Sequence, residues 1–592
     1  MDTLTNRLRQ HTIVLTVLIF LFAFAVRILS WQDNHQDVLK VQSSVTARYK
    51  ESARQLVTGD FKTFVTDVQR LGHPPGYPIF LAIIFKLAGK YTTIQFVQMV
   101  VDGVAVVVVF MIALELFKPT IAIITALLAA LSPQFSYFSV LVLPDSLVVL
   151  PILLAAYFII RSRKHYSTSS FLIAGALVGL SCWFRANALL LPIFLALLAF
   201  CTTTRSKRIS AAIAIIVGAV AVIAPITIKN AVVFHRFIPL SLGTGQTLLE
   251  GIADYDEQNR FNVPKTDVGL ARQEAETWGR PSYAEGLFNE DGIERDRRRV
   301  ARGFQIIKSN PLWFMSVVGS RALASTRLDP VPRLRPEAPV SHRVDILGPP
   351  SWQNTPDELL QSEHSPNATL KIADNKWLSI SGDDQAYGNQ ITSTPIRVEP
   401  FQDYVLSLPF KLEQGRAGVK ITSVDGGDVL AWTVVDVVEG IAPHEQPANQ
   451  LTIPFVSAKH TELRLVIANN AAIHSMMLVG TAQIVPLGPS SVTWLRYLRM
   501  PLRTLQRFFT TALVLPLVVL GVGLLVVQRR WQELAILLVV PAYYLIVQSV
   551  LHTERRYVYI IQYFFLILVS MVLCWIFEMV VKRTRSRRTT AP

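Results

Sequence analysis

The chain has 592 residues, of which 51% are hydrophobic and only 17% are charged, with a mean hydropathy of +0.38. This composition excludes an ordinary soluble domain. The net charge of +15 does not indicate nucleic-acid binding, because the Lys and Arg residues gather at the ends of long apolar runs. They recur at every second end, as expected when cytoplasmic loops of a membrane protein are basic.

Ten apolar runs approach the roughly 20 residues that cross the hydrocarbon of a bilayer. We predict a transmembrane helix in each of them: 12–30, 94–117, 120–139, 140–160, 171–184, 187–203, 209–228, 508–528, 532–550 and 557–580. The first run has no small-residue cleavage site behind it, so we expect it to be a retained helix and not a signal peptide. The shortest, 171–184, needs flanking residues to complete a span.

Residues 77–90 are apolar but short, and Lys86 interrupts them. Counting them as a span would turn every later basic loop outward, so we predict a juxtamembrane or re-entrant helix at the outer face. Both termini are then cytoplasmic, and residues 231–507 are extracytoplasmic. The predicted regions are 1–230, with seven spans and a first external loop at 31–93; 231–344, a mixed external region; 345–488, an external β domain; and 489–592, with three spans and a basic tail.

The β domain is predicted from short segments of alternating polarity that are separated by turn signals such as Gly426-Gly427. This pattern is typical of an antiparallel β-sandwich. Just before the eighth span, four arginines are expected to contact anionic lipid headgroups: Arg496, Arg499, Arg503 and Arg507. The three cysteines lie in or beside apolar runs, and their spacing indicates neither a disulfide nor a metal site.

Ionisable and aromatic side chains lie where spans are predicted to reach the outer face. Burying a charge near hydrocarbon is costly unless it has a partner or a task. The first external loop ends in a rigid turn, Leu71-Gly-His-Pro-Pro-Gly-Tyr-Pro78, that holds one histidine at the boundary. We expect these outer groups to converge into one cavity: Asp33, His35, Asp37, His73, Asp145, Arg185, His552, Glu554, Arg556 and Tyr557.

Each of these groups also has a structural alternative. An acid of the first loop can be a solvated surface group, and Asp145, which follows Pro144, can cap a helix. Arg185 and Arg556 can extend to the membrane interface as packing residues. Asp102, in the middle of a span, is most simply explained by a bond to a neighbouring helix.

Several of these segments, taken as a set, resemble the GT-C superfamily of membrane glycosyltransferases. The closest branch is that of protein O-mannosyltransferases and lipid A aminoarabinose transferases. The resemblance covers about 1–250 and 508–580, and the β domain more loosely resembles the carbohydrate-binding domains of some members. The segments are His73-Pro-Pro-Gly-Tyr-Pro78, Ser132-Pro133 to Pro144-Asp145, Phe184-Arg-Ala-Asn187, Lys229-Asn230 to Gly245, Glu250-Gly251 and His552-Thr-Glu-Arg-Arg-Tyr557.

The resemblance implies transfer of a sugar from a polyprenyl-phosphate donor to a glycan, lipid or protein acceptor at the outer face of a bacterial inner membrane. Such chemistry needs a carboxylate base and cations for the departing phosphate. The implied catalytic carboxylates are Asp33, Asp37 and Asp145. The implied phosphate ligands are His73, Arg185, Arg556 and His552, and the implied cavity residues are His35, Tyr77, Asn230, Glu554 and Tyr557. The expected partners are the donor lipid, the acceptor and membrane lipids, with no cofactor, while a need for a divalent cation stays open.

One departure from the family leaves alternatives open. Many relatives carry an acid four or five residues before a tyrosine of the first loop, whereas Ser44-Val-Thr-Ala-Arg48 precedes Tyr49 here. Either Asp33 or Asp37 replaces that acid, or the base lies elsewhere, or activity is lost. The alternatives to an enzyme are a non-catalytic membrane scaffold whose β domain recruits a partner and a transporter of lipid-linked sugars. A transporter would favour paired halves with broken spans, which this order of segments lacks.

Overall fold

The computed structural model describes residues 12–589, except 42, 329–330, 341, 343, 345–347, 374–375, 438–441, 471, 491–493 and 553. Within helices, the side chains of 35–41, 43–47, 91 and 583–589 also lie outside the described part. The chain forms two compact units. The first comprises Met1–Leu334 and Thr504–Pro592, and the second comprises Arg335–Arg503.

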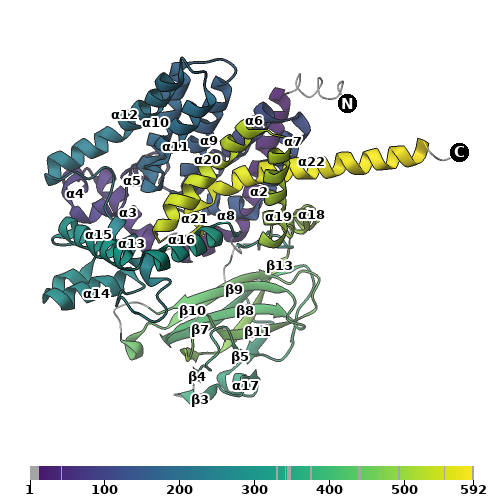
Figure 1. Ribbon diagram of the computed structural model, residues 1–592. Coiled ribbons are helices and arrows are strands. Elements are labelled where there is room, and N and C mark those ends of the chain that lie inside the picture. The colour runs from purple at the N-terminus through teal and green to yellow at the C-terminus, as the bar shows by residue number, and fades with distance from the viewer. Residues whose placement is uncertain are drawn as a thin grey trace. The chain divides into compact units, whose positions relative to one another are not determined.

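The first unit is helical (Figure 1). Its apolar helices are α2 (Thr12–Val41), α5 (Gly76–Ala88), α6 (Tyr91–Leu116), α7 (Pro119–Leu131), α8 (Pro133–Val140), α9 (Asp145–Ser162), α10 (Thr168–Phe184), α11 (Leu191–Thr202), α12 (Arg208–Phe234), α19 (Thr511–Val527), α20 (Trp531–Val547) and α22 (Ile560–Thr589). Its other helices are α3 (Ser43–Thr58), α4 (Phe61–Thr66), α13 (Thr244–Ala253), α14 (Asp267–Trp278), α15 (Gly292–Ser309), α16 (Pro311–Ser325) and α21 (Arg555–Val558). Helix α18 (Leu495–Gln506) precedes α19.

The described residues contain six helices long and apolar enough to cross a membrane, or up to eight if each bent pair is one span. The bent pairs are α7 with α8, at 50°, and α18 with α19, at 59°. At the first bend, Ser132 caps α8 by accepting a bond from the Phe135 amide, and Pro133 starts the new helix. These findings confirm a polytopic helical membrane protein. Two of the ten predicted spans, 171–184 and 187–203, fall on shorter apolar helices, as does the predicted juxtamembrane segment at α5.

Helices α10 and α12 pack with their backbones in close contact. A Cβ atom on Gly175 would lie 1.9 Å from the Ile215 carbonyl oxygen, and one on Gly218 would lie 2.1 Å from that of Leu172. Small residues allow this approach between helices in a bilayer. Arg185 is the residue at which α10 ends, so this packing also positions Arg185.

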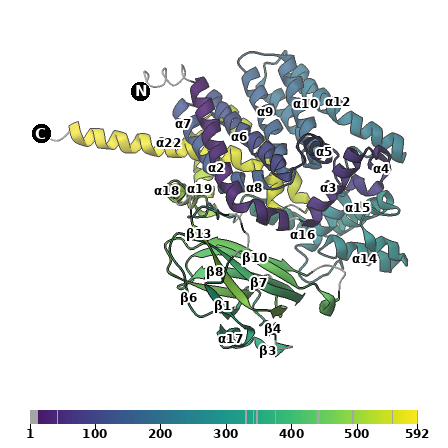
Figure 2. The same cartoon turned by 180° about the vertical axis from the view of Figure 1, so that it is seen from behind.

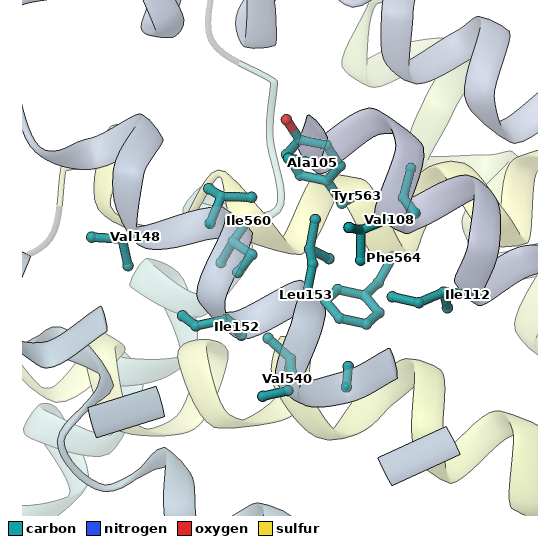
Figure 3. Close-up of a cluster of buried hydrophobic side chains, with 14 of the residues drawn as sticks. Ala105, Val108, Ile112, Val148, Ile152, Leu153, Val540, Ile560, Tyr563 and Phe564 are labelled. Carbon is teal, nitrogen blue, oxygen red and sulfur yellow. The ribbon is translucent and has the colours of Figure 1, made fainter. Parts of the chain in front are cut away.

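The core of the bundle joins helices that are far apart in the sequence. Side chains of α6, α9, α20 and α22 pack together, so the last helix lies among those of the N-terminal half (Figure 3). The labelled residues are Ala105, Val108, Ile112, Val148, Ile152, Leu153, Val540, Ile560, Tyr563 and Phe564, all buried.

A buried ion pair crosses this core. Arg27 Nη2 lies 2.6 Å from Asp102 Oδ2, and both side chains are fully buried. Tyr563 donates a hydrogen bond to Asp102 at 2.7 Å, and Arg27 also donates to the Ala130 carbonyl. The bond of Asp102 to a neighbouring helix, expected as its simplest role, is therefore confirmed.

The helix ends that were predicted to be cytoplasmic contact one another. Lys118 pairs with Glu578 at 3.1 Å, and Lys164 pairs with Glu115 at 2.5 Å. Arg530 donates a hydrogen bond to the Leu116 carbonyl at 2.9 Å. One end of the bundle therefore gathers the basic boundaries, which agrees with the alternation used to predict the topology.

The second unit contains two antiparallel sheets (Figures 1 and 2). One has the order β1-β13-β7-β12-β4-β3, with β10 also paired to β7, and the other has the order β2-β5-β11-β8-β9, with β6 also paired to β11. The strands are β1 (Trp352–Asn354), β2 (Glu363–His364), β3 (Thr369–Ala373), β4 (Trp377–Ser381), β5 (Asn389–Thr392), β6 (Ile396–Arg397), β7 (Gln402–Gln414), β8 (Arg416–Ser423), β9 (Val429–Asp436), β10 (Asn449–Val456), β11 (Glu462–Asn469), β12 (Met476–Val479) and β13 (Ala482–Pro489).

The two sheets share one core. Leu408 and Phe410 of β7 pack in the same buried cluster as Val419 and Ile421 of β8. Their alternation with outward residues produces a sandwich, so the predicted antiparallel β domain is confirmed.

The prediction of headgroup contact is wrong for Arg499, one of the four arginines before α19, and a second one, Arg496, has a partner within the protein. Arg499 is fully buried, and Arg496 pairs with Glu337 at 2.5 Å. Both arginines therefore stabilise the second unit itself. A run of basic residues beside a span resembles a lipid-binding segment in sequence even when the fold buries part of it.

Candidate active site

The turn after the first external loop is held against the end of α10. A Cβ atom on Gly76 would lie 2.5 Å from the Trp183 carbonyl oxygen, so only glycine fits there without a shift. The turn places His73 and Tyr77 beside Tyr49 of α3, with ring centroids 5.1 and 5.0 Å apart. Contacts to Tyr49 and Trp183 thus fix the histidine relative to α3 and α10.

Asp145 and Arg185 form a buried ion pair with one hydrogen bond, which Arg185 Nη2 donates to Asp145 Oδ2. Arg185 Nε lies 2.8 Å from Asp145 Oδ1, and Nη2 lies 3.0 Å from Oδ2. The side chains are 2% and 16% exposed, respectively. The alternative that Asp145 caps a helix is wrong, because Pro144 is the N-cap of α9 and no side chain caps that helix. The carboxylate faces Arg185, which is a stronger partner than a backbone amide.

The segment after α20 completes the cluster. Two guanidinium groups contact the Tyr557 ring, with Arg185 4.1 Å and Arg556 5.3 Å from its centroid. Glu554 accepts hydrogen bonds from Arg556 at 2.6 Å and from the Tyr557 hydroxyl at 3.0 Å. The amide of Asn187 donates to the Tyr557 carbonyl at 3.0 Å, which ties this segment to the end of α10.

A polar cavity lies in the middle of these groups. It encloses ≈ 10 Å³, or ≈ 200 Å³ with the space open to solvent. The enclosed part has room for about one water molecule. Its lining residues are Asp145, Val148, Val149, Arg185, Asn187, Tyr544, Arg556, Tyr557, Tyr559 and Ile560.

The charges around the cavity act on His73. His73 is exposed to solvent, although many protein atoms enclose it. This enclosure, together with the nearby Arg185, Arg48 and Arg556, lowers the pKa of His73 to about 4. The imidazole is therefore neutral at pH 7 and donates or accepts a hydrogen bond without adding a fourth positive charge. Burial raises the pKa of Tyr49 to about 12, so its hydroxyl stays protonated.

His552 belongs to a second cluster that is joined to the first through Glu554. Its Nδ1 lies 2.7 Å from Asp254 Oδ2, and Glu250 and Glu554 act on it electrostatically. Three carboxylates thus surround the imidazole. This environment favours a proton on the ring and disfavours a phosphate beside it.

The remaining predicted residues lie in different settings. Asp33 lies on α2 and is 6% exposed. Asp37 and His35 lie in the same helix, but their side chains are outside the described residues. Asn230 is fully buried and donates to the Ile238 and Leu240 carbonyls at 3.0 and 3.2 Å, which holds the loop after α12.

The sequence reasoning missed other residues of the site. Arg48 and Gln98 gave no signal, although Gln98 accepts the hydrogen bond of the Tyr77 hydroxyl at 2.9 Å. Glu250 and Asp254 are four residues apart on α13 and its C-cap, a spacing that places two acids on one helix face. Among the residues that the structure describes, no group of three or more His, Cys, Asp or Glu is arranged to hold a metal.

Residues 72–228 match the model of a family described as dolichyl-phosphate-mannose-protein mannosyltransferase. This part of the 592 residues includes His73, Asp145 and Arg185, and it ends before Glu554 and Arg556. No curated protein matches the sequence.

Three solved structures show low similarity to the chain. An arabinose-bound α-L-arabinofuranosidase, MgGH51, is 18% identical, with 23% of this chain and 24% of that chain covered and a TM-score of 0.18. A carbohydrate-binding module, CBM4, is 12% identical, with 20% and 77% covered and a TM-score of 0.17. Arabinosyltransferase EmbB from Mycobacterium smegmatis is 11% identical, with 69% and 59% covered and a TM-score of 0.18.

The chain covers less than two thirds of the arabinofuranosidase and of the arabinosyltransferase. At these TM-scores, the structural matches carry no argument about the site. The family match includes the turn, the start of α9 and the end of α10, which are three of the six segments on which the sequence resemblance was based. It confirms that this part of the helical unit resembles a GT-C superfamily membrane glycosyltransferase.

Proposed function

We propose that this protein transfers a sugar from a polyprenyl-phosphate-linked donor to an acceptor glycan, lipid or protein on the extracytoplasmic face of a bacterial inner membrane. The observation that carries the proposal is that Arg185 and Arg556 both lie against the Tyr557 ring and both line the same cavity. The matching family is named after dolichyl-phosphate-mannose, a sugar linked to a polyprenyl-type phosphate, and this name supports the donor class.

The arrangement suits a phosphate leaving group. Guanidinium groups bind phosphate oxygens through two parallel N–H donors. Arg185 donates one hydrogen bond to Asp145, and Arg556 donates one to Glu554, which leaves further N–H groups on each. Arg556 Nε is buried and has no hydrogen-bond partner among the described residues, so a ligand oxygen would satisfy it.

The charge of the cluster favours one phosphate over two. Arg48, Arg185 and Arg556 all act on His73, and Asp145 and Glu554 pair with two of them, which leaves one positive charge in excess. A phosphodiester carries one negative charge, whereas a diphosphate diester carries two. As the bond to the sugar breaks, negative charge grows on the phosphate and the fixed arginines stabilise it.

The test is donor binding and turnover by the full-length protein in nanodiscs. The probes are radiolabelled mannose and arabinose, each linked to polyprenyl phosphate. Arg185→Lys and Arg556→Lys keep the charge but remove the planar fork, so the donor Kd should rise by about tenfold or more. Arg163→Lys, at the opposite end of α9, is the matched control and should leave the Kd unchanged. If both site variants keep the donor affinity and the turnover of wild type, the proposed phosphate site is contradicted.

A further inference from the structure

The cluster around His552 is built to hold one imidazole in a fixed orientation. The His552 amide donates to the Thr247 carbonyl at 2.7 Å, and a Cβ on Gly251 would lie 2.7 Å from that amide nitrogen. Arg321 of α16 donates to the Gly251, Ser549 and Leu551 carbonyls, so one buried side chain joins α13 to the segment before His552.

The side chain of His552 is fixed as well. With Asp254 ionised, the 2.7 Å contact is a hydrogen bond that His552 Nδ1–H donates to the carboxylate. The proton on Nδ1 leaves the lone pair on Nε2, for which the described residues provide no hydrogen-bond partner. Both side chains are 31% exposed, so an acceptor molecule can reach the ring.

We propose that His552, oriented by Asp254, is the general base that activates the acceptor hydroxyl, an inference that rests on the proposed function. Nε2 takes the proton of the hydroxyl while the oxygen forms a bond to the anomeric carbon of the donor sugar. The bond between that carbon and the phosphate oxygen breaks, and the phosphate leaves with the electron pair. The proton then passes from His552 to solvent or to the departing phosphate.

The position of the cluster fits this role better than phosphate binding. Glu554 bonds to Arg556 of the phosphate site and also acts electrostatically on His552, so the two clusters adjoin. One is rich in arginine and suits the leaving group, and the other is rich in carboxylate and suits a base. A base here also agrees with the first loop, where Arg48 and not an acid precedes Tyr49.

The charged groups around the ring are Asp254 and Glu250 of the α13 segment, Glu554 of its own segment and Arg321 of α16. The hydrogen bond to Asp254 raises the pKa of His552, burial opposes the shift, and the charges of Asp254, Glu250 and Glu554 reinforce it. Turnover should therefore fall as pH decreases through this pKa, because the protonated ring is no base. Asp254→Asn should move that acidic limb to lower pH.

The experiment compares turnover and lipid binding in the full-length protein in nanodiscs. Turnover is the release of radiolabelled sugar from polyprenyl-phosphate mannose or arabinose with water as acceptor, measured across pH. His552→Gln should lower turnover by at least about 100-fold and leave the Kd for undecaprenyl phosphate unchanged. The matched control is His342→Gln, because His342 and Asp403 form a similar pair at 2.6 Å in the second unit, and its turnover should match wild type.

Four results would overturn the inference. Full turnover in His552→Gln would exclude His552 as the base while leaving the proposed function intact. If that variant binds undecaprenyl phosphate more weakly, and its turnover falls only by the same factor as its affinity, His552 is a phosphate ligand and not the base. An acidic limb that stays in place in Asp254→Asn would mean that the pair is only structural. A wild-type protein that neither binds nor turns over any of the donors would overturn the proposed function and this inference with it.

Discussion

Replacing Asp145 by Asn tests whether a buried carboxylate holds Arg185 in the site. Asparagine keeps the size of the side chain and removes its charge. Asp145 is 2% exposed and Arg185 is 16% exposed, so water screens the pair poorly. Removing one partner of a buried ion pair costs about 3–5 kcal/mol. We expect the lower end of this range, because Arg185 keeps its contact with the Tyr557 ring.

The assay is thermal unfolding of the full-length protein in nanodiscs, with and without undecaprenyl phosphate. The control is Glu51→Gln, which removes the Arg54–Glu51 pair of α3, exposed by 71% and 43%. Such an exposed pair contributes about 1 kcal/mol or less. At a lipid concentration of about 100 times Kd, bound undecaprenyl phosphate stabilises the folded protein by about 2.7 kcal/mol.

The lipid should stabilise the Asp145→Asn variant more than wild type, since its phosphate supplies the anion that Arg185 has lost. Two results would refute the reasoning. One is an Asp145→Asn protein that melts no earlier than Glu51→Gln. The other is a destabilised variant that binds undecaprenyl phosphate but gains no more stability from it than wild type does.

Three further changes probe other parts of the first unit. Gly76→Ala puts a methyl group 2.5 Å from a backbone carbonyl of α10, so it should lower stability by about 1–3 kcal/mol and weaken donor binding. The control Gly319→Ala, which has open space around it, should do neither. Arg27→Met leaves Asp102 as a buried carboxylate without its ion-pair partner and should lower the stability of the fold by about 3–5 kcal/mol. Adding Asp102→Leu should recover much of this loss, and a double-mutant cycle with no coupling between the two positions would be the contrary result. Because the pKa of His73 is lowered to about 4 from its ordinary 6.5, its protonation favours unfolding as pH falls from 6.5 toward 4, and His73→Gln should reduce this acid sensitivity in melting curves measured against pH.

The sequence predicted well what depends on local composition. Apolar runs gave the helices, and the alternation of basic ends indicated which ends meet. His73, Arg185 and Arg556 were expected together because each lies at an outer span end; in the structure Arg185 and Arg556 line one cavity, and both act electrostatically on His73. The bend at Ser132 could also have been found, since a serine followed by proline is a typical helix start.

What the sequence did not predict depends on partners distant in the chain. Asp145 follows a proline at a helix start, which favours a cap locally, but its partner Arg185 lies 40 residues further on. Asp254 and His552 are 298 residues apart, so no local pattern indicates their bond. The burial of Arg499 in the second unit depends on the folding of that unit in the same way.

The central claim is that the phosphate of a lipid-linked donor binds between Arg185 and Arg556. A cryo-EM structure of the full-length protein in nanodiscs with undecaprenyl phosphate tests it most directly. Our account expects phosphate density within about 3 Å of guanidinium nitrogens of both arginines and beside the His73 ring, with the lipid chain leading away from the cavity. Phosphate density elsewhere on the protein, with the Asp145–Arg185 pair and the cavity unchanged, would contradict it.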